Sequence, residues 1–121
     1  MSSEANKQVA CIKQAINESK PISGKFYRVL TCCKDEATVR KFIFNNKVFT
    51  SVAPEENKHY AEIFFAQNSG AFVEFDLKTP IKGFKASNFE TIFAPDTFTP
   101  SKYDLINIGD RCNLTYKVRL N

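Results

Sequence analysis

The amino-acid sequence predicts one mainly β domain with a single N-terminal helix, an α+β protein by content. Three observations support this prediction. One apolar stripe with helical spacing lies near the N-terminus, short runs of β-prone residues fill positions 24–120, and turn-forming residues separate those runs. At 121 residues the chain can bury the core of one domain but not of two. We therefore expect a helix within residues 1–21 and a β-rich barrel or sheet over 24–120.

The first segment predicts a helix over residues 3–19, which Ser2 or Ser3 can cap. Its apolar residues follow one another at intervals of four, three and four, so they form one narrow stripe. The stripe consists of Ala5, Val9, Ile12 and Ile16. Pro21 prevents the helix from continuing. We expect the helix to cover one side of a sheet, and docking on another subunit's helix is the alternative.

Residues 25–33 are apolar on both faces, which is typical of a central strand or of a curved strand in a small barrel. Lys34-Asp35-Glu36 follows as a turn. Residues 39–52 then predict a tight hairpin, because Asn45-Asn46 can adopt the positive φ angles of a two-residue turn. One face of this hairpin is core: Val39, Ile43, Val48 and Val52. The other face combines cations with aromatic rings: Arg40, Phe42, Phe44, Lys47 and Phe49.

A second hairpin is predicted over residues 59–77, with Gly70 at the left-handed position of a three-residue loop. Its core face holds Ala61, Ile63, Phe65, Val73, Phe75 and Leu77. Its outer face holds Tyr60, Glu62, Phe64, Phe72, Glu74 and Asp76. Because the charges of that outer face are acidic, we do not expect the whole sheet to be basic.

The remaining segments are less regular. Residues 82–88 predict a basic exposed loop, 89–93 either a short strand or a helical turn, and 97–102 an open loop. After a turn at Gly109-Asp110, residues 112–120 alternate strictly between apolar and polar types. This last strand carries Lys117 and Arg119 on its outer face.

Several classes of function find no support in the sequence. His59 is the single histidine, the glycines are too scattered for a phosphate-binding loop, and no set of nucleophile and base occurs, so we do not expect an enzyme. The four cysteines lack C-x-x-C spacing, which predicts reduced, buried thiols and neither a metal nor another cofactor. Without an apolar run of membrane length or a signal peptide, we expect a cytosolic protein.

The basic and aromatic hairpin face is the main indication of function. Single-stranded nucleic acids bind cations through their phosphates and aromatic rings through their bases, and the net charge of +4 permits such a partner. The hypothesis is binding of single-stranded DNA without sequence preference. Phe42, Phe44 and Phe49 would stack on bases. Arg40, Lys47, Lys117 and Arg119 would neutralise phosphates, and Lys82 and Lys85 would extend the cationic surface.

The end of the chain adds a resemblance. Residues 108–120 place Gly-Asp before an alternating strand, which is similar to the late-strand signature of single-stranded-DNA-binding proteins of the oligonucleotide-binding (OB) fold. Small phage and plasmid members of that family are about this long. The resemblance implies a small OB-like antiparallel barrel and a role in DNA replication. Two features depart from the family: the chain ends without an acidic tail, and its helix precedes the strands.

Two alternatives belong to other classes. One is a protein–protein inhibitor or adaptor, such as a small viral factor acting in the host cytoplasm, with Glu62, Glu74 and Asp76 imitating nucleic acid. The other is a subunit of a homo-oligomer, because 12 Phe and 4 Tyr exceed what a small core needs and can fill an interface.

Overall fold

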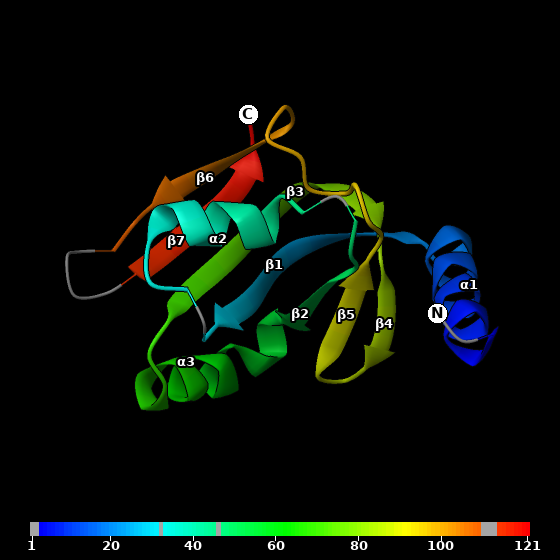
Figure 1. Ribbon diagram of the computed structural model, residues 1–121, viewed down its shortest axis with the longest axis horizontal. Coiled ribbons are helices and arrows are strands. Elements are labelled where there is room, and N and C mark those ends of the chain that lie inside the picture. Colours follow the sequence, from blue (N-terminus) through cyan, green and yellow to red (C-terminus); the bar gives the residue numbers. More distant parts are fainter. Residues whose placement is uncertain (1–2, 32, 46, 110–113) are drawn as a thin grey trace.

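The computed structural model describes residues 3–31, 33–45, 47–109 and 114–121. Seven strands form one mixed sheet with the order β4-β5-β2-β1-β3-β7-β6 (Figure 1). The elements in chain order are α1 (Ser3–Glu18), β1 (Pro21–Leu30), α2 (Glu36–Ile43), β2 (Thr50–Pro54), a 3-10 turn η1 (Glu55–Asn57), α3 (Lys58–Gln67), β3 (Ala71–Lys82), β4 (Phe84–Ser87), β5 (Glu90–Phe93), β6 (Tyr103–Asn107) and β7 (Leu114–Leu120).

The longest strand, β3, organises the sheet. It pairs with β1 in antiparallel and with β7 in parallel orientation, and the other neighbouring strands are antiparallel. Strands β4 and β6 form the two edges and do not pair with each other in the described residues. The expected mainly β, α+β class is confirmed, and the sheet is open instead of closed into a barrel.

The core lies on one face of the sheet, beneath α2 and the loop that precedes β6. Val39 and Ile43 of α2 are buried in the same cluster as Phe75 of β3. Phe98 from the loop contacts Phe75, with ring centroids 4.9 Å apart. Because successive side chains of a strand point to opposite faces, Phe72 and Glu74 project away from this core.

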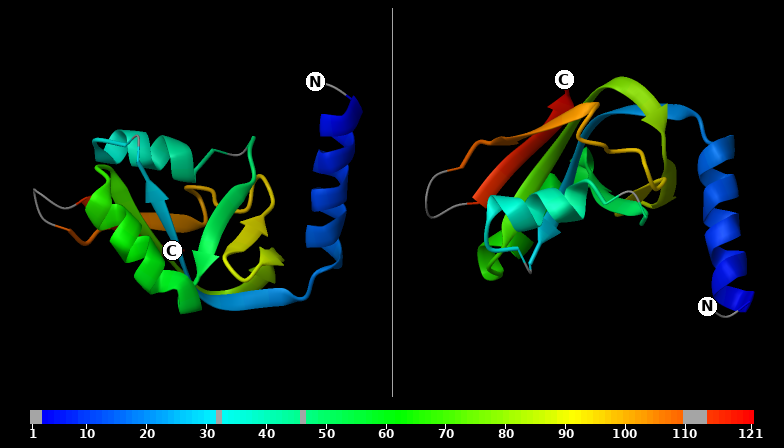
Figure 2. Two further views of the ribbon diagram at one scale, coloured as in Figure 1. Left: turned by 90° about the horizontal axis from the view of Figure 1, so that it is seen from below. Right: turned by 45° about the horizontal axis from the view of Figure 1, so that its top comes forward.

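Helix α3 lies against the opposite face, so that β1 runs between α2 and α3 (Figure 2). Its Phe65 contacts Phe72 of β3, with ring centroids 5.5 Å apart. Phe72 in turn lies 5.7 Å from the ring of Tyr27 in β1. Helix α1 stands at the far end of the molecule beside β4 (Figures 1 and 2).

The first predicted hairpin is wrong, because its first half is helix α2. The Asp35 side chain caps this helix by accepting hydrogen bonds from the Thr38 backbone N–H at 2.8 Å and the Thr38 hydroxyl at 2.7 Å. Val39 and Ile43 are buried as expected, and so is Val52, but Val48 is 49 % exposed. Asn46 of the predicted turn lies outside the described residues.

The second predicted hairpin is wrong in the same way, because residues 58–67 form α3. Its β3 half is confirmed: Val73, Phe75 and Leu77 are buried. Ile63 is exposed and Phe65 faces the other side of the sheet, which corrects their expected place in the core. Gly70 does have a positive φ of 145°, but it connects a helix to a strand.

Of the remaining predictions, some are confirmed and others are corrected. Helix α1 and strand β1 are confirmed, and β7 is confirmed from Leu114, whereas residues 110–113 lie outside the described part. Residues 90–93 form a strand, and residues 84–87 within the expected basic loop do so too. Cys33 is buried as predicted, but Cys11 is exposed on α1.

Candidate functional site

The structure separates the rings and cations of the predicted nucleic-acid surface. Residues two apart share a face of a strand, but on helix α2 Arg40 and Phe42 point in different directions. Phe42 is 45 % exposed, whereas Phe44 packs half-buried against the core. The Arg40 guanidinium lies 5.7 Å from the centroid of the Phe44 ring. Lys47 is exposed and Phe49 half-buried in the segment before β2.

Three further cations of that surface contact groups of their own chain. Lys82 Nζ donates a hydrogen bond to the Asn17 carbonyl at 2.8 Å. Lys85 Nζ lies 3.6 Å from Glu56 Oε1 in an exposed pair. Lys117 Nζ lies 3.4 Å from Glu74 Oε2, across strands β7 and β3.

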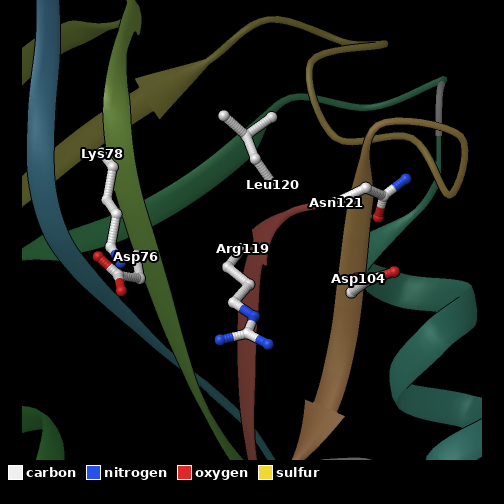
Figure 3. Close-up of a pocket in the computed structure, with 6 residues that line it drawn as sticks. All are labelled: Asp76, Lys78, Asp104, Arg119, Leu120 and Asn121. Atoms are coloured by element: carbon white, nitrogen blue, oxygen red, sulfur yellow. The ribbon is translucent and has the colours of Figure 1, made fainter.

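Arg119 projects into a pocket of about 210 Å³ that also contains carboxylates (Figure 3). It lies opposite Asp76 in the β3–β7 register and opposite Asp104 in the β6–β7 register. The pocket thus holds two cations, Arg119 and Lys78, and two carboxylates, Asp76 and Asp104, so a phosphate at Arg119 would also meet negative charge. Lys117 and Arg119 also lie on the sheet face opposite α2, so they do not join Arg40, Phe42 and Lys47 in one surface.

The acidic surface considered for nucleic-acid imitation is also interrupted. Glu74 pairs with Lys117, and Asp76 lies between Lys25 and Arg119 in the strand registers. Charges of opposite sign therefore alternate across this part of the sheet. The arrangement neutralises itself and does not present a row of negative charge.

A different surface has the features of a binding site. None of the ten residues of helix α3 is buried. Four of them are nevertheless large apolar or aromatic residues: Tyr60, Ile63, Phe64 and Phe65. Ala61 and Phe65 face the sheet. Tyr60, Ile63 and Phe64 point outward and are 66 %, 41 % and 48 % exposed. Lys58, His59, Glu62 and Gln67 make the rest of the helix surface polar, and no described residue buries the apolar strip formed by Tyr60, Ile63 and Phe64.

A groove of about 330 Å³ runs between α3 and the neighbouring strands β1, β2 and β5. We call it the α3 groove and define it by Val29, Ala53, Tyr60, Ala61, Phe64 and Phe89. Phe89 lies in the turn between β4 and β5 and is 67 % exposed. The buried Asn57, directly before α3, donates its side-chain N–H to the carbonyl of Asn88. This hydrogen bond ties the two walls together and places Phe89 beside α3.

Tyr27 lies beneath α3 and joins the groove to the other side of the helix. Its side chain is 1 % exposed, and the Lys58 ammonium lies 5.5 Å from its ring centroid. Burial, followed by the negative charge of Glu74, raises the pKa of Tyr27 to about 12. A second hollow of about 330 Å³ on that side is lined by Glu62, Phe65, Phe72 and Glu74, among others.

The folded protein is expected to lose stability as the pH rises between 10 and about 12. In this window the unfolded chain ionises Tyr27 while the folded protein keeps it neutral. The free energy of unfolding, measured with urea across this range, should fall less steeply in Tyr27→Phe. A residual slope is expected, since burial also raises the pKa of Tyr103 and of Tyr116. Tyr60→Phe, at an exposed position, is the control; an unchanged slope in Tyr27→Phe would contradict the assignment.

Sequence reasoning missed the exposed side of α3, although its spacing was visible. Tyr60, Ile63 and Phe64 stand at positions i, i+3 and i+4, which is the spacing of one helix face. No comparable signal identifies Phe89, because its place depends on the contact between Asn57 and Asn88.

Within residues 3–31, 33–45, 47–109 and 114–121, no three His, Cys, Asp or Glu side chains gather to hold a metal ion. No helix of these segments has the length and hydropathy needed to cross a membrane. Comparison with models of known families, with curated proteins and with solved structures finds no match to this chain.

Proposed function

We propose that this protein is an adaptor that binds another polypeptide in the α3 groove. The observation that carries the proposal is the uncovered apolar face of α3 beside an exposed Phe89. Apolar patches rimmed by polar residues mark interaction sites, and aromatic side chains are enriched in the energetically dominant centres of interfaces. Removing Tyr60, Phe64 and Phe89 from water on binding would therefore supply the driving force.

The rim of the groove indicates the chemistry of the partner. Glu55, Glu56 and Glu90 are exposed. Glu90 lines the groove and accepts a hydrogen bond from the Ser51 hydroxyl, and the half-buried Arg28 lines the groove as well. Glu56 is the member of this group that pairs with a lysine, Lys85, and that pair is exposed and weak. A partner segment with an apolar face bordered by lysine or arginine would match this rim.

Single-stranded DNA binding is the second candidate, and it now concerns a smaller surface. The observation in its favour is Phe42, which is 45 % exposed on the helix that also carries the exposed Arg40 and Lys41. The exposed Lys47 follows this helix in the chain. Lys117 and Arg119 are no longer proposed as phosphate-binding residues, because carboxylates lie beside them. The resemblance to OB-fold proteins supports this second candidate. An OB-like barrel would require the edge strands β4 and β6 to pair, whereas the sheet described above is open. Both candidates keep the cytosolic setting that the sequence predicts.

Site-specific photo-crosslinking tests both candidates. A photoreactive phenylalanine analogue is placed at position 64, 89 or 42 in cells that make the protein, with a labelled single-stranded oligonucleotide added to the extract. We expect polypeptide adducts from positions 64 and 89 and none from 42, and Tyr60→Glu should reduce the adduct from position 89. Absence of polypeptide adducts at both groove positions would overturn the adaptor proposal. An oligonucleotide adduct at position 42 that weakens as salt is raised would support the second candidate instead.

A further inference from the structure

Helix α1 has an apolar stripe that its own chain covers only in part. Ile16, at the C-terminal end of the stripe, is buried, but Ala5, Val9 and Ile12 are half-buried. The helix contacts the body mainly through β4, next to the Lys82–Asn17 hydrogen bond. An isolated helix of 16 residues is only marginally stable in water, so α1 depends on further packing of its stripe.

Helices α3 and α1 lie apart in all three views, with strands β4 and β5 between them (Figures 1 and 2). The chain runs from α1 directly into β1, whose other end lies near α3. While Pro21 and Ile22 remain paired with Lys82 and Ile81, α1 therefore stays away from the groove of its own chain. Each chain therefore has a partly covered helix and, apart from it, an uncovered groove. A second copy of the chain can satisfy both.

The two surfaces match in length and charge. The stripe from Ala5 to Ile16 spans about 17 Å, and α3 is about 15 Å long, at 1.5 Å per residue. Lys13 is the charged residue nearest the stripe on the helix surface, whereas Glu4 and Glu18 lie toward the far side. A helix with this pattern presents an apolar face bordered by a cation, which is what the acidic rim of Glu55 and Glu90 would attract.

An irregularity near the start of β1 offers a point where the direction of α1 could change. Residues 23–25 are exposed, and Gly24 has a φ of 120° with nothing within 4 Å of the place where a Cβ would lie. The register of β1 with β3 also shifts between Ile22 and Gly24. A turn at this point would break the pairs of Pro21 with Lys82 and of Ile22 with Ile81, together with the Lys82–Asn17 hydrogen bond, and would leave residues 25–30 in the sheet.

From these observations we infer that the α3 groove binds helix α1 of a second copy, in a dimer in which each chain places its α1 in the other's groove. The two reciprocal contacts are related by a twofold axis, so the assembly closes at two copies. The inference rests on the proposed protein-binding role of the groove and names the partner as this same chain. Phe64 and Phe89 would contact Val9 and Ile12 of the partner chain.

Mass in solution, measured by light scattering over a dilution series, gives the first test. The natural chain should be dimeric, and Phe64→Glu and Ile12→Glu should each raise the dissociation constant at least about thirty-fold, as expected for central interface residues. Phe42→Glu, which alters a similarly exposed phenylalanine on α2, should leave the dimer intact. Circular dichroism confirms that each variant is folded.

Isotope-resolved crosslinking identifies the contact. Light-isotope chains that carry the photoreactive residue at position 64 are mixed with heavy-isotope chains that lack it. The inference expects light residue 64 joined to a heavy peptide from residues 3–18. A monomer at all concentrations, or a dimer insensitive to both Phe64→Glu and Ile12→Glu, would overturn it. If residue 64 then still captures a different polypeptide, the adaptor proposal stands without this inference; if it captures no polypeptide, both fail.

Discussion

Replacing Gly70 with alanine is expected to destabilise the protein far more than the same replacement at Gly24. Both glycines have φ angles that side chains with a Cβ rarely adopt, +145° and +120°. A Cβ at position 70 would lie 2.2 Å from the Leu30 carbonyl oxygen and 2.7 Å from the Thr31 Cα, whereas nothing lies within 4 Å at position 24. Backbone strain of about 1–3 kcal/mol applies to both variants, and the clash applies only to Gly70→Ala.

Unfolding in urea measures this difference. We expect Gly24→Ala to lower the free energy of unfolding by about 1–3 kcal/mol, from strain alone. Gly70→Ala should lower it by more than about 4 kcal/mol, because the atoms in its way belong to the backbone of a central strand and cannot rotate aside. Equal losses in the two variants would show that the close approach of residue 70 to the end of β1 is not maintained.

The sequence predicted the strands of the sheet centre because their pattern has a single interpretation. Val73, Phe75 and Leu77 alternate with Glu74 and Asp76, and the three apolar residues together do not fit one face of a helix. Val39 and Ile43 are different, because residues four apart share a face in a helix and in a strand alike. The aromatic residues around them favour a strand, and only the cap at Asp35 indicates the helix.

The candidate site depended on that ambiguity. Placed on a strand, Arg40 and Phe42 belong to one basic and aromatic surface, and placed on α2 they separate. Conversely, the predicted hairpin placed Tyr60 and Phe64 on one outer face with Glu74. On α3 they lie apart from Glu74 and line a groove with Phe89. The position of Phe89 follows from tertiary contacts that no local pattern contains. Secondary structure therefore had to be known before the surface chemistry could be assigned.

Two phenylalanine-to-alanine variants should separate the stability of the fold from the function of the groove. Phe75 is completely buried on the central strand β3, and its ring packs against Phe98. Phe75→Ala leaves a cavity and should lower the free energy of unfolding by about 3–5 kcal/mol. This is a large share of the roughly 5–15 kcal/mol that a domain of this kind possesses.

Phe89→Ala is the matched control, because its ring is 67 % exposed. Measured at a dilution where the chain is monomeric, it should change the free energy of unfolding by no more than about 0.5 kcal/mol. The same variant should weaken capture of polypeptide at position 64, since one wall of the α3 groove is lost. A loss of stability comparable to that of Phe75→Ala would mean that Phe89 packs inside the monomer. In that case the groove would be closed, and the adaptor proposal would lose the observation that carries it.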